Sequence, residues 1–280
     1  MIATLKDHHD IGVLLDISGL ARSTFYYHLA RLDREDPHVE LKAAITQIFT
    51  QNKARYGHRR VHLELRKQGW QIAKKTVLKL MRVLRLTCKT RSRKRFSSYR
   101  GEVGGLAPNL LGREFFAARP NEKWVTDVTE FKLGEAKLYL SPILDLCDRS
   151  IVAFATSRHP TVEFAVSSLQ DALAQLTDQG ALLVHSDQGF HYQHARWRDC
   201  LAQVGARQSM SRKGNCLDNA VMENFFGHLK EEMFHHDSFE SIEELEREVH
   251  AYIAWYNTER VSLTLEGMSP MEYRAHALAA

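Results

Sequence analysis

Residues 124–131, with the sequence WVTDVTEF, decide the fold of this chain. Their alternating, β-branched pattern predicts a strand. Asp127 lies inside this strand, where a charged side chain is unusual and requires an explanation. Two strand-like runs follow closely, LYLSPILDL and IVAFATS, so three strands arrive in quick succession. The run ALLVHSD predicts another short strand, and helices are expected at residues 162–176, 194–204 and 218–233. This order favours an α/β layered core with a mixed sheet.

Two more acidic residues stand out by their position relative to these elements. Asp187 ends the predicted strand ALLVHSD and precedes a glycine turn, and Glu223 lies in the first turns of a predicted helix. Ligands of open α/β sheets gather at the carboxyl ends of strands, so these carboxylates and Asp127 could converge. Taken alone, each acidic residue is more often solvated surface or a helix cap. Together, three carboxylates suit Mg²⁺, and two such ions ~3.5–4 Å apart can clamp both oxygens of a phosphoryl displacement.

The segment upstream of the sheet is strongly basic. Residues 51–100 contain 17 Lys plus Arg and one acidic residue, Glu64, so this segment carries +16. The whole chain carries +4, which leaves −12 for the remainder. Helices are predicted at residues 38–51, 58–68 and 73–85, with Gly69 ending the second and with Lys74 and Lys75 off the apolar stripe of the third. A glycine turn before a basic helix predicts a helix-turn-helix that reads DNA.

Two flanking segments are less structured or shorter. Residues 87–112 pass from a basic run into a glycine-rich stretch, which indicates a linker that can follow a phosphate backbone. Residues 12–32 predict two helices around a break at Ser18 and Gly19, and this span is short enough to be only a fragment of a helix-turn-helix.

Composition excludes several classes of protein. Hydrophobic residues make up 44% and charged residues 26% of the 280 residues, which is ordinary for a globular protein. No apolar run approaches the ~20 residues of a membrane span, and no secretory h-region follows the N-terminus. A cytoplasmic, DNA-associated protein is therefore expected. The cysteines form no C-x-x-C pair, so free thiols are expected, and the neighbouring histidines lack a cysteine pair that would complete a zinc set (Cys88, Cys147, Cys200, Cys216; His185, His191, His194).

Three motifs together resemble a known family. WVTDVTEF, then HSDQG, then a gap of 36 positions from Asp187 to Glu223 in CLDNAVMENFFGHLK, resemble the D, D-35-E triad of the DDE transposase and retroviral integrase superfamily. More closely, they resemble the second-frame (OrfB-type) transposase of the insertion-sequence-three family. The segment from YGHRRVHLELRKQGW to KLMRVLRL resembles the helix-turn-helix of these enzymes, and YNTERVSLTLEGMSPMEY resembles their C-terminal signature. In this chain Val261 and Ser262 follow Arg260, where the family often has Pro-His.

The resemblance implies an α/β, RNase H-like (integrase) catalytic core with a mixed sheet, preceded by a small all-α helix-turn-helix module. The expected organisation is a short helical segment at 1–36, the DNA-binding domain with its basic linker at 37–100, and the catalytic core with a C-terminal helix and tail at 114–280. It implies Mg²⁺ or Mn²⁺, two ions, held by Asp127, Asp187 and Glu223. The implied activity is metal-dependent strand cleavage and strand transfer at the terminal inverted repeats of an insertion sequence.

The implied partners are double-stranded DNA, as terminal repeats and as target, and further copies of the chain, with the upstream-frame protein as another candidate and no membrane. Two groups of basic residues are predicted to contact DNA, the first at the repeats and the second near the scissile bond: Arg59, Arg60, Lys74, Lys75, Arg91, Arg93, Lys94 and Arg95; Arg212, Lys213 and Lys230. A solvated surface lysine remains the alternative for Lys230. A non-catalytic or partner-dependent DNA-binding regulator and a plain RNase H-type nuclease stay open as alternative functions.

Overall fold

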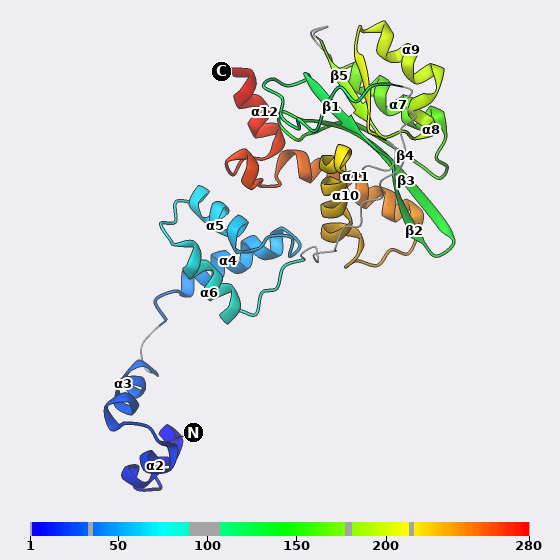
Figure 1. Ribbon diagram of the computed structural model, residues 1–280. Coiled ribbons are helices and arrows are strands. Elements are labelled where there is room, and N and C mark those ends of the chain that lie inside the picture. The colour runs from blue at the N-terminus through cyan, green and yellow to red at the C-terminus, as the bar shows by residue number, and fades with distance from the viewer. Residues whose placement is uncertain (1, 33–35, 90–106, 177–180, 213–215, 280) are drawn as a thin grey trace.

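The computed structural model describes residues 2–32, 36–89, 107–176, 181–212 and 216–279 (Figure 1). Short helices at the N-terminus are followed by a bundle of three helices and then by a layered α/β core. Five basic residues of the sequence-based predictions lie outside the described residues, so the structure says nothing of their placement: Arg91, Arg93, Lys94, Arg95 and Lys213.

Within the described residues the core is built on a six-stranded sheet, which is mixed as its sequence predicts. Its order is β2-β3-β1-β5-β6, and β4 pairs with β3. Strands β1, β2 and β4 run antiparallel to β3, whereas β5 is parallel to β1 and β6 is parallel to β5. The strands are β1 (Lys123–Thr126), β2 (Thr129–Leu133), β3 (Ala136–Asp145), β4 (Ile151–Ser157), β5 (Leu183–Ser186) and β6 (Arg207–Met210).

The prediction of one strand through Asp127 is wrong in one respect. Two strands, β1 and β2, end and begin on either side of Asp127 and Val128. Both pair with β3 in the same continuous register, Thr126 with Ile143 and Thr129 with Leu140. The gap falls where this register sets Pro142, which has no backbone N–H, opposite Asp127. Four early strands are therefore present in place of the three expected, and Asp127 lies in a break of the ladder.

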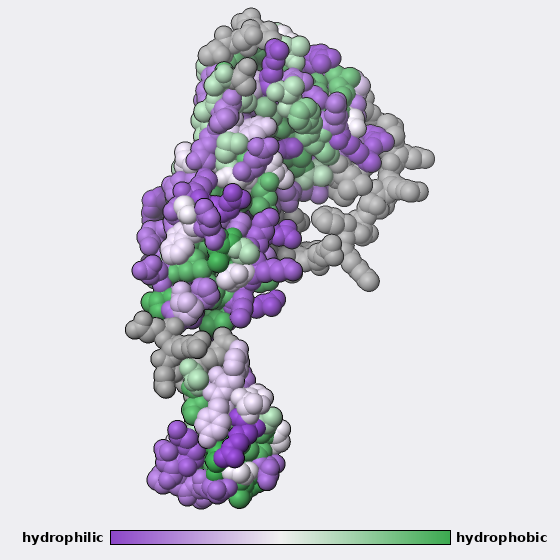
Figure 2. All heavy atoms as spheres, turned by 90° about the vertical axis from the view of Figure 1, so that its left-hand side faces the viewer, coloured by the Kyte–Doolittle hydropathy of each residue, from purple (hydrophilic) through white to green (hydrophobic). Residues whose placement is uncertain are grey.

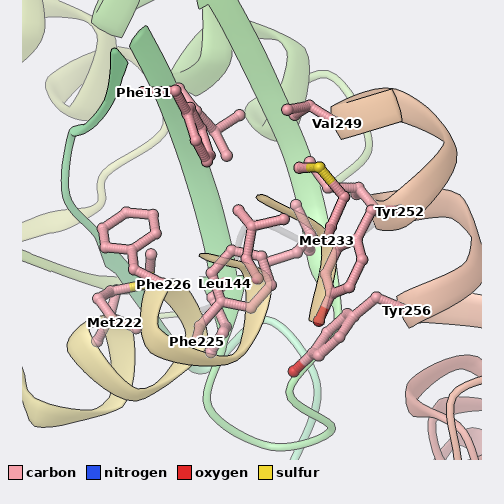
Figure 3. Packing of buried hydrophobic residues seen from close by; sticks show 14 of the residues in the cluster. Phe131, Leu144, Met222, Phe225, Phe226, Met233, Val249, Tyr252 and Tyr256 are labelled. Atoms are coloured by element: carbon pink, nitrogen blue, oxygen red, sulfur yellow. The ribbon is translucent and has the colours of Figure 1, made fainter. Parts of the chain in front are cut away.

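Helices cover both faces of the sheet. Successive residues of β1 alternate between two apolar clusters, Trp124 on one face and Val125 on the other, as the two-residue period of a strand requires. On the face of Trp124 lie α7 (Val162–Leu173), α8 (Phe190–Gln193) and α9 (Ala195–Gln203). On the face of Val125 lie α10 (Ala220–Leu229), the π-helical turn η2 (Lys230–Phe234) and α11 (Ile242–Thr258), and Figure 3 shows Phe225 and Tyr256 packed beside Leu144.

Three predictions about short elements need correction. The 3-10 turn η1 (Cys216–Asn219) precedes α10, so the helix expected at 218–233 is divided between α10 and η2. Strand β6 and helix α8 were not expected. The short tail contains η3 (Leu263–Leu265) and a helix, α12 (Pro270–Ala279).

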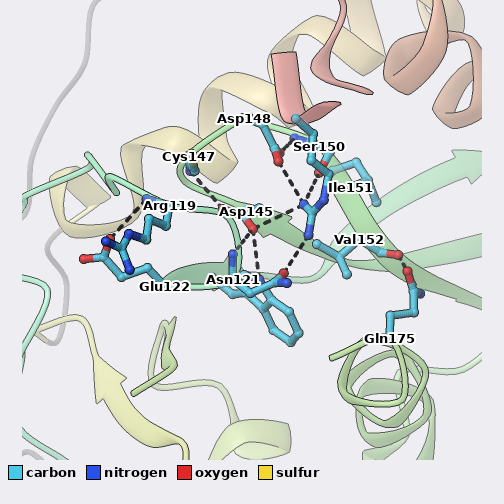
Figure 4. A network of polar contacts seen from close by, with 12 residues as sticks. Arg119, Asn121, Glu122, Asp145, Cys147, Asp148, Ser150, Ile151, Val152 and Gln175 are labelled. Atoms are coloured by element: carbon cyan, nitrogen blue, oxygen red, sulfur yellow. Dashed lines mark hydrogen bonds and ion pairs between the residues drawn. The ribbon is translucent and has the colours of Figure 1, made fainter. Parts of the chain in front are cut away.

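A buried ion cluster fastens α12 to the core. Arg274 donates from Nη1 to Asp148 at 2.9 Å and to Asp145 at 3.4 Å, and both aspartates are fully buried. Figure 4 shows Asp145 at the centre of this network, where Asn121 and Cys147 also donate their backbone N–H groups to it. Burial, and next the charge of Asp148, raises the pKa of Asp145 to about 6.

The predicted basic helices form a three-helix module of α4 (Val39–Gln51), α5 (His58–Lys67) and α6 (Lys74–Val83), as Figure 1 shows. Their apolar stripes meet in one buried cluster that includes Ile45, Leu65 and Val77. Six residues join α5 to α6, and Gly69 lies among them at φ 90°, in the left-handed region that favours glycine. Figure 2 shows mainly hydrophilic side chains on this part of the visible surface.

The three-helix module contacts the core along a seam, which is formed by Arg60, Glu232, Tyr252, Arg260 and Val261. Glu232 of η2, which is 3% exposed, accepts hydrogen bonds from Arg60 Nη1 at 3.1 Å and from Arg260 Nε at 2.8 Å. Tyr252 donates its hydroxyl to the same carboxylate at 2.8 Å. Val261 of the C-terminal tail is fully buried in the apolar cluster of the module. One carboxylate and one tail residue therefore connect parts of the chain about two hundred positions apart.

Candidate active site

Two of the predicted carboxylates lie side by side because their strands are neighbours. Strands β1 and β5 are parallel and pair Trp124 with Val184 and Val125 with His185. The same register, carried two residues further, brings Asp127 opposite Asp187. Adjacent strands lie ~4.8 Å apart, so both carboxylates leave the carboxyl end of the sheet at the same place. The prediction that Asp187 directly follows a strand is confirmed, since β5 ends at Ser186.

Local backbone groups fix one oxygen of each aspartate. Val128 donates its N–H to Asp127 Oδ1 at 2.8 Å, and this hydrogen bond occupies an amide within the break between β1 and β2. Gly189 donates its N–H to Asp187 Oδ1, also at 2.8 Å. A Cβ at Gly189 would come within 2.9 Å of that same oxygen, so a side chain there would displace the carboxylate. Each aspartate keeps a second oxygen that these hydrogen bonds do not use.

The third carboxylate comes from helix α10, and Asn219 ties that helix to strand β1. Glu223 is half-buried in the first turn of α10. Asn219, at the N-cap position, donates from Nδ2 to the carbonyl of Thr126 at 3.1 Å. Thr126 immediately precedes Asp127, so one buried hydrogen bond joins the start of the glutamate's helix to the residue before the first aspartate. From sequence, helix capping or outward solvation of Asn219 is as well supported as a catalytic role; in the structure its side chain makes no capping hydrogen bond and is buried.

The electrostatics show that the three carboxylates share one region. Burial, followed by the negative charge of Asp187 and, with a smaller effect, that of Glu223, raises the pKa of Asp127 to about 7. Within the described residues no three His, Cys, Asp or Glu side chains lie close enough together to hold a metal ion as they stand. Coulombic coupling acts over longer distances than coordination, and three like charges repel one another. The oxygen donors and their shared negative potential fit a divalent cation.

Asp218 was not predicted, yet it organises the loop beside this site. It is fully buried and accepts hydrogen bonds from Arg212 Nε at 3.0 Å and from Arg113 Nε at 2.7 Å. These hydrogen bonds outweigh burial and hold its pKa well below the usual range. Asn109 donates to the same carboxylate at 3.0 Å. Asp218 directly precedes Asn219, so this ion cluster and the Asn219 tether together fix the chain that enters α10.

The neighbouring histidines His185, His191 and His194 have separate hydrogen-bond partners. His185 is fully buried between Ser209 Oγ at 2.8 Å and Ser211 Oγ at 3.0 Å, and burial lowers its pKa to about 4. His191 Nε2 lies 3.0 Å from the carbonyl of Pro160. His194 accepts the N–H of Arg196 as a cap of α9. His185 is therefore a neutral residue that links β5 to β6 and to the loop after β6 by hydrogen bonds.

The predicted DNA-contacting residues take different positions. Arg59, Lys74 and Lys75 are exposed on α5 and α6. Arg60 is mostly buried against Glu232, and Lys230 is half-buried, with its Nζ 5.5 Å from the centre of the Phe131 ring. Arg212 is half-exposed but bound to Asp218. Burial lowers the pKa of Lys230.

A mixed sheet of this topology, with two aspartates on adjacent strand ends and a glutamate on the packed helix, defines the class of integrase-type catalytic cores. The family model described as integrase core domain matches residues 117–216, and a second integrase core model matches residues 223–278. The model of an HTH-like domain matches residues 37–95.

Curated relatives narrow this class to a family. The chain is 47% identical over 270 residues to the putative transposase InsK for insertion sequence element IS150 of Escherichia coli, covering 96% of this chain and 95% of that protein. It is 34% identical over 276 residues to the transposase InsF for IS3A of E. coli, covering 96% and 95%. A transposase for IS904 of Lactococcus lactis is 35% identical over 238 residues, covering 84% and 94%. The chain belongs to the IS3 family of insertion-sequence transposases.

Solved structures include retroviral integrases. The HTLV-2 integrase catalytic core domain in complex with magnesium aligns at a TM-score of 0.45 and 16% identity, covering 56% of this chain and 97% of that chain. A chain from the structure of the simian T-cell lymphotropic virus intasome in complex with PP2A regulatory subunit B56 gamma aligns at a TM-score of 0.49 and 17% identity, covering 82% of this chain and 74% of that chain. Among the described residues, no helix is both long and apolar enough to cross a membrane.

Proposed function

We propose that this transposase is a DDE-type polynucleotidyl transferase, which cleaves DNA at the terminal inverted repeats of its element and joins those ends to target DNA. The observation that carries this proposal is the register of β1 with β5, which sets Asp127 beside Asp187. Glu223 faces the same region from α10, as its charge on Asp127 indicates. Three carboxylates at one point of an RNase H-like sheet suit phosphoryl transfer, in which catalysis depends on positioning and charge stabilisation.

The three carboxylates would hold Mg²⁺ or Mn²⁺, with two ions proposed. Hard cations of this kind prefer oxygen ligands, and the second oxygens of Asp127 and Asp187 are not used by their backbone hydrogen bonds. When bound, such ions supply charge stabilisation and activation of an oxygen nucleophile. The protein's part is to orient the carboxylates, through the turns at Val128 and Gly189 and the tether from Asn219.

The domain organisation supports this activity. We assign the short helical segment to residues 1–36, the DNA-binding domain with its basic linker to 37–100, and the catalytic core to 114–280. The exposed cations Arg59, Lys74 and Lys75 would contact phosphates of the terminal repeat. Arg212, Lys213 and Lys230 would lie near the scissile bond, and residues 91–95 would follow the backbone. Arg60 differs from these residues, because its charge is paired with Glu232 in the seam between the module and the core.

The active assembly would be a multimer on DNA. Transposition brings two element ends together, and each end needs a catalytic site. Duplex DNA, as repeat and as target, is therefore the main partner, and a product of the upstream frame is a further candidate.

The test uses the purified full chain with Mg²⁺ or Mn²⁺ and a labelled duplex that carries the element's own terminal repeat. Glu223→Gln and Asp127→Asn remove one carboxylate each, and we expect both to abolish nicking and joining while binding to the duplex persists. Glu130→Gln is the matched control, since Glu130 is only three positions from Asp127 but binds Lys137 and Tyr139 on the surface. It should keep wild-type rates.

Other outcomes would redirect the assignment. Binding without nicking, by wild type and variants alike, would favour a partner-dependent or regulatory DNA-binding protein, and adding the upstream-frame product would then be the next experiment. Nicking without joining would favour a plain nuclease. Wild-type nicking by Asp127→Asn would contradict the role of that aspartate.

A further inference from the structure

The N-terminal segment contains a second pair of helices, outside the HTH-like match. Helix α2 (Ile11–Ser18) and helix α3 (Arg22–Leu32) are separated by the three residues Gly19, Leu20 and Ala21. Figure 1 shows this pair away from the catalytic core, on the far side of α4–α6. A three- or four-residue turn with a glycine is the spacing of a DNA-binding helix-turn-helix. The α5–α6 connection is longer, at six residues.

The turn between α2 and α3 is held by backbone hydrogen bonds, and Gly19 has a backbone conformation that favours glycine. Gly19 has φ 67° and ψ 20°, which is the left-handed conformation that ends many helices. Its N–H donates to the carbonyl of Asp16, and Leu20 donates to the carbonyl of Leu15 at 3.2 Å. Asp10 caps the start of α2 through the N–H groups of Gly12 and Val13. Both ends of α2 are therefore fixed by hydrogen bonds.

Two buried apolar residues mark the inner side of the α2–α3 pair. Leu15 of α2 and Phe25 of α3 are each only 5% exposed, so they form the buried side of the pair. With 100° per residue, Arg22, Tyr26, Ser23 and Tyr27 lie about 60°, 100°, 160° and 200° around the helix from Phe25, so they form one continuous face that runs from the flank of Phe25 to the side opposite it. Tyr26 is 49% and Tyr27 57% exposed, and Arg22 and Ser23 are exposed as well.

The chemistry of that face suits duplex DNA. Helix α3 contains no acidic residue, whereas Asp10 and Asp16 belong to α2 and its cap. Arg22, Ser23 and Tyr26 stand in the first half of α3, and in a helix-turn-helix the N-terminal residues of the second helix reach the base edges. Arginine, serine and tyrosine supply donors and acceptors for bases and phosphates.

We infer that α2 and α3 form a second DNA-reading helix-turn-helix, in which α3 enters the major groove of the element's terminal repeat. The chain then contacts each repeat at two places, one through α3 and one through the α4–α6 module. The inference rests on the proposed function only in taking the terminal repeat as its ligand.

The experiment is hydroxyl-radical footprinting and affinity measurement with the full chain, in EDTA so that no cleavage occurs, on a duplex that carries the terminal repeat and its flanks. Wild type should protect two separate patches. Arg22→Gln and Tyr26→Ala should each lose one patch and bind ~10-fold more weakly, while the other patch persists. Ile17→Ala is the control, because Ile17 is 80% exposed on α2 and lies outside the proposed DNA-contacting face of α3. All three residues are exposed, so folding should be preserved.

The outcomes separate this inference from the proposed function. If wild type gives no footprint on the repeat, the proposed function fails. If wild type protects the repeat but Arg22→Gln and Tyr26→Ala leave the footprint and affinity unchanged, the second helix-turn-helix is overturned. An unchanged footprint with an altered sedimentation coefficient would assign the face to protein contacts, which also overturns it.

Discussion

Removing the charge of Glu232 tests whether the seam holds the three-helix module on the core. Glu232 is 3% exposed and faces Arg60, Arg260 and Tyr252 at 2.7–3.1 Å. The substitution Glu232→Gln keeps the volume of the side chain but leaves two arginines in the seam without their counter-charge. Breaking a buried ion pair from one side costs about 3–5 kcal/mol.

The pKa of Glu232 gives a second route to the same magnitude. The charge of Arg260, followed by its hydrogen bonds and the charge of Arg60, outweighs burial and lowers the pKa of Glu232 from 4.5 to about 2. A depression of this size corresponds to about 3 kcal/mol of folding free energy. Because the folded-state pKa is the lower one, this contribution is complete above pH 4.5 and is lost as the pH falls toward 2.

The assay is urea unfolding followed by tryptophan fluorescence, since Trp255 lies in the seam with the Arg55 guanidinium 4.6 Å from its ring. With a slope of about 3 kcal/mol/M, Glu232→Gln should unfold about 1 M earlier at pH 7. Its deficit relative to wild type should shrink as the pH falls from 4.5 toward 2.

The matched control is Glu248→Gln. Glu248 binds Lys53 of the module across the same seam at 3.2 Å, but both side chains are more than a third exposed. An exposed pair contributes at most about 1 kcal/mol, so this variant should resemble wild type. A Glu232→Gln protein within 1 kcal/mol of wild type at pH 7 would refute the reasoning.

Three further predictions follow from single contacts. Asn219→Ala should slow strand cleavage at least ~10-fold with unchanged DNA affinity, because the hydrogen bond from Asn219 to Thr126 positions the helix that carries Glu223. The control Asn224→Ala changes an exposed residue and should keep the wild-type rate. Equal cleavage rates of the two variants in gel assays would contradict this. Val261→Ala should lower unfolding free energy by about 1–3 kcal/mol in urea titrations, and Leu263→Ala, 51% exposed, should have little effect; equal losses would refute the burial argument. Tyr192→Phe removes a buried hydroxyl that forms no hydrogen bond of normal geometry with the described residues, so its melting temperature should stay equal or rise, and a clear fall would reveal a partner.

The positions of two of the proposed catalytic carboxylates, Asp187 and Glu223, were predictable because they are tied to element ends. A strand pattern that stops at Asp187, and a helix that starts before Glu223, place both residues without any knowledge of packing. The helices α4, α5 and α6 were predictable for a similar reason, since each has a clear apolar stripe. The register of β1 with β5 then turns these separate positions into one site.

The supporting residues were not predictable, because their roles depend on distant partners. Glu232 follows a helix in a segment of mixed charge, KEEMF, and only the packed tail shows that it is buried. Asp218 and Asn219 have the residue types of surface loops, yet both are buried by contacts with the chain near residues 109–126. Strand β6, RQSM, lacks an apolar pattern in its sequence. It is recognisable as a strand only through its pairing with β5.

The burial of Val261 among the helices of the module has a consequence for the order of events during synthesis. Tyr56 donates its hydroxyl to the carbonyl of Glu259 and accepts the N–H of Val261, 203 and 205 positions later. At 5–20 residues per second, a ribosome needs about 10–40 s to reach that valine after the tyrosine. Throughout that interval the nascent module has an open apolar side, which closes only after Val261 has been synthesised. A chain cut short before Val261 would therefore keep this apolar side exposed, and exposed apolar surface favours aggregation.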